Sequence, residues 1–172
     1  MTIRNALIAA GSALALSTLA TAAFAAGSVS TTAPASVTVL SPITIAKTQD
    51  LAFGQVVRPS NVNANTVVLD ANNTVTLTGT GNGSMVASTT SSAKFNVSAP
   101  AGTTYSTTQG LIFTQTGLTN VAASTPTTTN GTAGVVPASG VQEIRYGAQF
   151  DMTSSTPAQN YTGTLSVTVN YN

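Results

Sequence analysis

The chain has 172 residues, of which 5% are charged, and it contains no His, no Cys and no Trp. Such a length suits one domain with a substantial hydrophobic core. Without His and Cys, no side chain is suited to acid–base catalysis near neutral pH, and disulfides, thiolate metal sites and catalytic thiols are excluded. A formal net charge of +1 is too small for a nucleic-acid-binding surface. We therefore expect no nucleic acid partner, no enzyme activity, no cofactor and no metal site.

Residues 1–25 have the three parts of a signal peptide. Arg4 gives the positive start, residues 6–19 form the apolar run, and Ala23 and Ala25 are the small residues that precede the cleavage site. A membrane-spanning helix is disfavoured because the run is short and is diluted by Gly, Ser and Thr. We predict cleavage after Ala25, export to the periplasm and the cell surface or medium, and a protein that is not integral to a membrane.

The rest of the chain divides into a polar N-terminal extension, residues 26–36, and a single domain, residues 37–172. In this domain apolar and polar residues alternate with a period of two, which indicates strands, and no window shows helical spacing. The predicted strands, in chain order, cover residues 37–45, 51–57, 74–78, 94–99, 111–115, 143–152 and 161–171. Thr and Val dominate these segments, as is usual on pleated sheets.

The last predicted strand has the clearest alternation. One of its faces carries Leu165, Val167, Val169 and Tyr171, and the other carries mainly Thr and Ser. The segment before it, residues 143–152, alternates in the opposite parity. With seven to nine short antiparallel strands at this spacing, we predict an all-β sandwich of immunoglobulin-like type.

Three polar stretches rich in Gly, Asn and Thr separate the predicted strands. We expect loops over residues 59–65, 79–92 and 120–140, and the third is long enough to be a hairpin tip or a binding loop. Glu143 and Arg145 share the polar face of one strand and are expected to form a surface ion pair. Aromatic side chains at apolar positions are assigned to the core: Phe53, Phe95, Phe113, Tyr146 and Phe150.

Three blocks of the chain, residues 41–57, 93–105 and 160–172, together resemble a known family. It is a secreted proteobacterial domain family of unassigned function that looks pilin-like, similar to spore coat protein U-type proteins and to chaperone–usher fimbrial subunits. The blocks span nearly the whole exported chain, although residues 122–138 match nothing in that pattern. The Cys pair of the better-known fimbrial subunits is also missing.

The resemblance implies a sandwich that lacks its final strand, so that an apolar groove stands open beside an incomplete sheet. A periplasmic chaperone fills such a groove first, and the N-terminal extension of the next subunit replaces the chaperone in the fibre. The groove-lining residues that the resemblance implies are Leu165, Val167, Val169 and Tyr171.

The resemblance also implies a donor strand upstream of the domain. One row of alternating residues in this region has Val29, Val37 and Val39 as its larger apolar side chains, and Pro34 removes one hydrogen-bond donor from the strand. Alternatively, residues 37–45 form an ordinary first strand of the domain's own sheet.

Two functions remain open at this point. The leading hypothesis is a structural subunit of a bacterial surface fibre or coat, which assembles by β-strand complementation. Its partners would be further copies in a homopolymer or related subunits, together with a periplasmic chaperone and an outer-membrane usher. The alternative is a self-contained secreted adhesin or carbohydrate-binding module that uses residues 120–140 and closes its own sheet.

Overall fold

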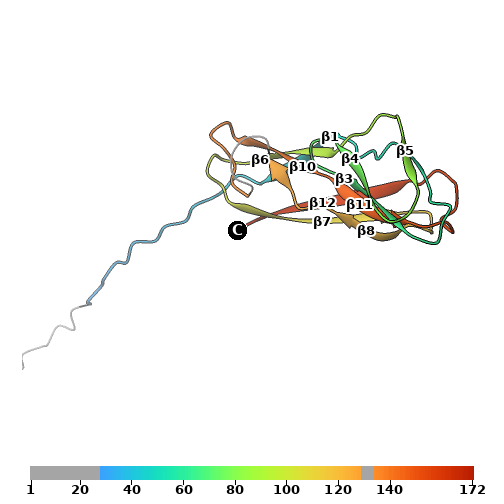
Figure 1. The fold of residues 1–172 in the computed structure, drawn as a ribbon. Coiled ribbons are helices and arrows are strands. Elements are labelled where there is room, and N and C mark those ends of the chain that lie inside the picture. The colour runs from blue at the N-terminus through green and yellow to red at the C-terminus, as the bar shows by residue number, and fades with distance from the viewer. Residues whose placement is uncertain (1–27, 129–133) are drawn as a thin grey trace, which may run out of the picture. The chain divides into compact units, whose positions relative to one another are not determined.

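The computed structural model describes residues 28–128 and 134–172. Within these ranges the fold is all-β, with antiparallel pairing throughout and no helix (Figure 1). The described part of the chain accordingly holds no helix that is long and apolar enough to cross a membrane. The predicted signal peptide, with Ala23 and Ala25, lies outside the described residues.

The described chain forms twelve strands, nine of which have five residues or more. Their bounds are β1 (Thr44–Gln49), β2 (Gln55–Val57), β3 (Asn65–Leu69), β4 (Val75–Gly79), β5 (Ser84–Val86), β6 (Ala93–Ser98), β7 (Tyr105–Phe113), β8 (Thr119–Ala123), β9 (Thr127–Thr128), β10 (Val141–Tyr146), β11 (Ala148–Met152) and β12 (Gly163–Tyr171). The total exceeds the expected seven to nine because several short strands lie in stretches that were predicted as loops.

The strands form a β-sandwich, as predicted. Two four-stranded sheets have the orders β1-β6-β10-β9 and β4-β3-β11-β8, and two further pairs are β12-β7 and β2-β5. One core cluster joins β6 and β10 to β7 and β12, and includes Phe95, Val97 and Tyr146. A second cluster joins β3, β4, β8 and β11 to β2, β5 and Phe113 of β7. Each cluster fills the space between two layers of strands, which is the defining feature of a sandwich.

The predicted alternation of residues 143–152 is confirmed, but the segment is two strands in two sheets. Ile144, Tyr146, Ala148 and Phe150 are all buried, while the chain passes from β10 to β11 at Gly147. A Cβ atom at Gly147 would lie 2.0 Å from the Leu69 carbonyl oxygen, so only glycine fits this close approach. The sheet switch therefore depends on a residue without a side chain.

The first strand begins later than the sequence predicts. Residues 37–43 have no strand structure, and Val37 and Val39 are 86% and 88% exposed. Pro42 explains the difference, because proline cannot donate a hydrogen bond to a sheet and pushes its predecessor away from regular pairing. Residues 28–38 belong to a separate unit from residues 39–172, and they contain no helix or strand.

The predicted loops contain strands that the sequence did not reveal. β3 begins at Asn65, β5 lies within residues 79–92, β9 lies within residues 120–140, and β8 lies in the same stretch except for its first residue, Thr119. Asn65 was assigned to a loop because Asn favours turns. It is nevertheless buried, because its Nδ2 donates to the carbonyl oxygens of Thr78 and Gly81 at 3.1 and 3.0 Å, and its Oδ1 accepts from the Gly83 N–H. These backbone partners satisfy the amide within the strand.

Candidate functional site: a groove between the first and last strands

The first and the last strand are both edge strands. Among the described residues, β1 pairs only with β6, and β12 pairs only with β7. Beyond the ends of β12, the Thr162 carbonyl accepts a hydrogen bond from the Thr114 N–H, and the Asn172 N–H donates to the Thr104 carbonyl. Since the register of β12 and β7 has no shift, its even-numbered residues bond toward β7. The N–H and C=O groups of its odd-numbered residues, among them Leu165, consequently point to the unpaired edge.

The two edges meet at one end of the gap between them. There the Tyr171 hydroxyl donates a hydrogen bond to the Ser41 carbonyl oxygen. Cα atoms of β1 and β12 approach to within 8 Å. A strand placed between two others separates them by about 9.6 Å, twice the usual spacing. The gap is therefore closed to an additional strand at the Ser41 end.

Away from that end the gap widens into a groove of about 1150 Å³. One wall is formed by residues 47–58, from the end of β1 through β2, and the other by residues 156–165, which lead into β12. The floor contains apolar side chains from β6, β7 and β11: Phe95, Leu111, Phe113, Phe150 and Met152. The groove is thus bounded by the end of β1 with β2 on one side and by residues 156–162 with the start of β12 on the other, and it reaches down to the core.

Aromatic rings dominate the middle of this groove. Phe53 lies on one wall and contacts Phe150 edge-on, with ring centroids 4.9 Å apart. Phe113 contacts Phe150 at 5.9 Å and Phe53 at 6.3 Å, and also meets Tyr161 at 6.3 Å. Phe150 is buried, whereas Phe53 and Phe113 remain half-buried. These rings offer a rigid apolar surface that the chain's own strands leave partly uncovered.

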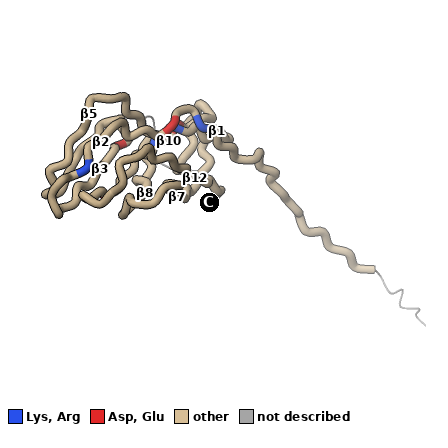
Figure 2. Tube along the Cα trace, turned by 90° about the vertical axis from the view of Figure 1, so that its right-hand side faces the viewer, with Lys and Arg blue, Asp and Glu red and all other residues tan. Residues whose placement is uncertain are grey.

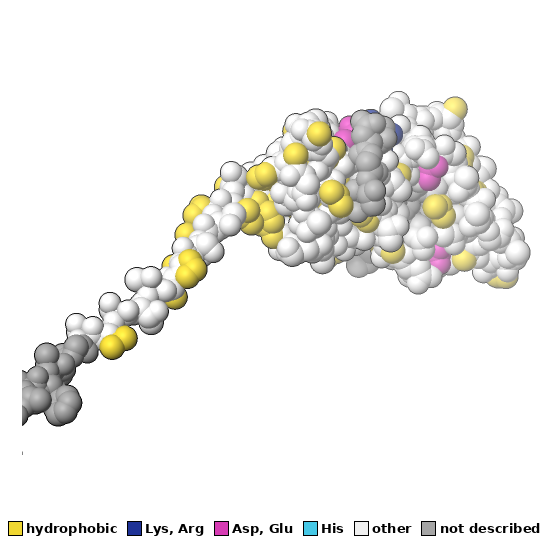
Figure 3. Space-filling model, turned by 90° about the vertical axis from the view of Figure 1, so that its left-hand side faces the viewer, with side chains coloured by type: hydrophobic (Ala, Val, Ile, Leu, Met, Phe, Trp, Pro, Cys, Tyr) yellow, Lys and Arg dark blue, Asp and Glu magenta, His cyan; other side chains and the backbone are white. Residues whose placement is uncertain are grey.

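Charged groups lie only along the rim of the groove among the residues that line it. Lys47 and Asp50 form an exposed ion pair, and the Arg58 guanidinium donates to the Thr156 carbonyl oxygen. Elsewhere, the predicted Glu143–Arg145 pair is confirmed at 2.8 Å. Figure 2 shows that charged residues gather around β1 and β10. The face drawn in Figure 3 carries scattered apolar side chains and few charges.

The structure separates the residues that the resemblance implied as groove lining. Leu165 lines the groove. Val167 and Val169 share its face of β12 and, like Leu165, pack against the first core cluster, but they do not line the groove, and Tyr171 lies at the closed end. The candidate donor residues Val29, Val37 and Val39 are exposed and lie outside any strand.

Sequence reasoning missed the wall formed by residues 47–58 and the aromatic floor. Phe53, Phe113 and Phe150 were assigned to the core because they occupy apolar positions, and Phe150 is indeed buried there. Alternation identifies which side chains point inward. It carries no information about which part of the interior is left without a covering strand, since this depends on how far β1 and β12 diverge.

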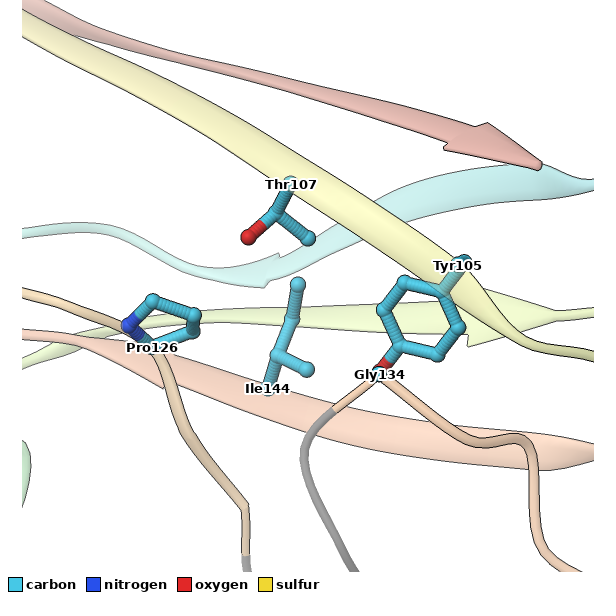
Figure 4. A pocket seen from close by; sticks show the side chains of 5 residues that line it. All are labelled: Tyr105, Thr107, Pro126, Gly134 and Ile144. Carbon is cyan, nitrogen blue, oxygen red and sulfur yellow. The ribbon is translucent and has the colours of Figure 1, made fainter. Parts of the chain in front are cut away.

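A second, smaller cavity of about 200 Å³ lies at the opposite end of β7, between Tyr105, Thr107, Pro126, Gly134 and Ile144 (Figure 4). The buried Tyr105 hydroxyl points toward Gly134, and that of Tyr146 lies near Thr107, but neither contact reaches hydrogen-bond geometry. Burial raises the pKa of both tyrosines above the ordinary value of 10.0. The hydroxyls are polar groups inside an otherwise apolar layer.

One known protein family matches most of the chain. Neither the curated proteins nor the solved structures include a match to it. The sequence model of one family, described as a domain of unknown function (DUF4402), matches residues 43–171. The matched range runs from the residue before β1 to the last residue of β12, and so includes both edges of the groove. The chain therefore belongs to the DUF4402 family of domains of unknown function.

Proposed function

We propose that this chain is a structural subunit of a bacterial surface fibre or coat, and that its groove accepts an extended segment of another subunit as a β-strand. The observation that carries the proposal is the apolar groove between β1 and β12, two strands that each have an unpaired edge. Addition of a strand to a sheet edge is a general mode of recognition, in which backbone hydrogen bonds give affinity and side-chain pockets give specificity.

The size of the groove suits a strand. Strands rise about 3.3 Å per residue, lie about 4.8 Å apart and pack in layers about 10 Å apart, so that one residue occupies roughly 160 Å³. A groove of about 1150 Å³ thus has room for about seven strand residues. A strand of this length leaves out the end of the gap that is closed between Ser41 and Tyr171.

The energetic reason for complementation is the apolar surface that the groove exposes. Full burial of a side chain the size of Phe or Leu contributes about 1.5–3 kcal/mol. Phe53, Phe113 and Leu165 are only half-buried, and the odd-numbered backbone groups of β12 have no strand beside them. An unpaired edge beside exposed apolar surface is a site of association with other chains. We infer that an incoming strand covers the half-buried apolar side chains and also pairs with the free backbone groups of β12.

The donor in this proposal is an N-terminal extension such as residues 26–39 of this chain, which presents Val29, Val37 and Val39 on one row. It comes from another copy or from a related subunit. A periplasmic chaperone that occupies the groove before assembly, and an outer-membrane usher, are the further partners proposed. Export by the predicted signal peptide brings the chain to the periplasm and the cell surface.

A second candidate is a self-contained secreted adhesin or carbohydrate-binding module. It is favoured by the cavity beside residues 120–140, where two buried tyrosine hydroxyls approach Thr107 and Gly134. Such a module would be a monomer, and removal of its N-terminal extension would leave its oligomeric state unchanged.

The test compares the exported chain, purified from the periplasm, with a variant that lacks residues 26–36. We expect heat-labile multimers on an unheated denaturing gel and fibres in negative-stain micrographs for the complete chain. Both should be lost in the shortened variant if its own extension is the donor. A folded chain that stays monomeric in every preparation, with or without a co-expressed chaperone and also when related subunits are supplied as donors, would overturn the proposal and favour the adhesin.

A further inference from the structure

We propose that the groove is built for a strand with bulky apolar side chains, supplied by a related but different chain rather than by a second copy of this one. The inference rests on the proposed function, because it specifies the partner that enters the same groove. It follows from a mismatch between the floor of the groove and the chain's own N-terminal extension.

The middle of the groove is aromatic. Phe53 on one wall and Phe113 and Phe150 on the floor hold one another through edge-on and tilted contacts, with centroid distances from 4.9 to 6.3 Å. Such contacts fix the rings, so the surface that they present does not collapse around a small side chain. A side chain that covers this surface must reach it from the level of the β1 and β12 edges.

Few side chains are available to do so. The groove holds about seven strand residues, and alternate residues of a strand point to opposite faces. Only three or four side chains of an incoming strand therefore face the floor. Each must be large if the groove is to be filled to the density of a protein interior.

The chain's own extension has no such side chains. In the row that contains Val29, any seven consecutive residues present at most two Val side chains, with Ala, Thr or Gly at the other positions. The opposite row consists of Ser, Thr and Pro up to Leu40. Leu40 adjoins Ser41, whose carbonyl is bonded to Tyr171, and so it stays with its own domain.

A strand taken from this extension would therefore leave voids above the rings. Replacing a large core side chain by Ala removes both the burial of its atoms and the contacts of the residues around it. We expect one Phe on the inward row to strengthen binding about tenfold or more relative to Ala.

Three labelled peptides provide the test. The first has the sequence of residues 28–40, the second carries Ala35→Phe on the Val29 row, and the third carries Ser36→Phe on the opposite row. The third is matched to the second in hydrophobicity and differs in the face that carries the ring. Dissociation constants for the exported chain are measured by fluorescence anisotropy.

The proposal predicts that the Ala35→Phe peptide binds at least about tenfold more tightly than the other two peptides. Phe113→Leu in the protein should weaken binding of this peptide, whereas Ile112→Leu, on the exposed face of the same strand, should not. Both replacements keep an apolar side chain, so that the variants fold.

Two results would contradict the proposal in different ways. If the native-sequence peptide binds as tightly as the Ala35→Phe peptide, a second copy is an adequate donor, and the choice of partner is wrong while strand complementation stands. If none of the three peptides binds, the groove does not accept strands, and the proposed function fails together with this inference.

Discussion

The hydroxyl of Tyr171 donates a hydrogen bond to the carbonyl oxygen of Ser41, 130 residues earlier in the chain. This bond connects the last residue of β12 with the segment that precedes β1, across the gap between two edge strands. It closes one end of the gap, whereas the other end remains an apolar groove. A strand that fills only the groove can leave the bond intact, but a strand that runs the whole length of β12 must break it.

The Tyr171→Phe variant separates these two cases. Loss of one hydrogen bond should lower the free energy of unfolding of the unassembled chain by about 0.5–1.5 kcal/mol, measured by urea denaturation. If full insertion breaks this bond, the variant should also form multimers faster than the native chain. Tyr161→Phe is the control for loss of a tyrosine hydroxyl, because it keeps the ring that lines the groove and its hydroxyl bonds to the Pro157 carbonyl at 2.9 Å, away from the closed end. An assembly rate that Tyr171→Phe leaves unchanged would mean that this end stays closed during assembly.

Gly147→Ala should disrupt the passage of the chain from β10 to β11. The added Cβ would lie 2.0 Å from the Leu69 carbonyl oxygen, so the backbone of two strands must move. Overpacking of this kind costs about 1–3 kcal/mol of stability or more. At Gly110, on the exposed face of β7, a Cβ would meet nothing within 4 Å, and alanine there should be neutral within about 0.5 kcal/mol. Equal thermal midpoints for the two variants would contradict this account of the sheet switch.

The buried tyrosines predict a loss of stability at alkaline pH. Burial raises the pKa of Tyr105 and Tyr146 above 10.0, so the folded chain keeps protons that the unfolded chain releases. The stabilising contribution is therefore complete below about pH 10 and is lost as the pH rises through the folded-state pKa values. Thermal midpoints measured from about pH 8 upward should show this decline. The double variant Tyr105→Phe and Tyr146→Phe should decline less steeply. An equally steep decline would assign the effect to other groups.

The sequence was sufficient to predict the sandwich, because alternation reports which face of each strand is buried. The row Ile144, Tyr146, Ala148 and Phe150 is inward as expected, even across the change of sheet. The ion pair Glu143–Arg145 could also be predicted, since two residues on one face of a strand lie close together whatever the topology. Both features depend only on local geometry.

The groove could not be predicted in the same way. Leu165 and Val169 have the same parity and similar sequence surroundings, yet only Leu165 lines the groove. What distinguishes them is the distance from β12 to β1, a long-range property of the fold. β3 was missed for a related reason, because the partners that make a buried Asn65 acceptable, Thr78 and Gly81, become neighbours only when the sheet forms.

Amide hydrogen exchange along β12 tests the central claim, strand addition to its free edge, most directly. The even-numbered residues Thr164 and Ser166 bond toward β7, so their amides should exchange slowly in both the monomer and the assembled form. The Gly163 and Leu165 amides face the unpaired edge beside the groove and should exchange fast in the monomer and at least about tenfold more slowly after assembly. Fast exchange at Gly163 and Leu165 in assembled material, beside protected Thr164 and Ser166, would show that no strand pairs with β12 and would contradict the proposal.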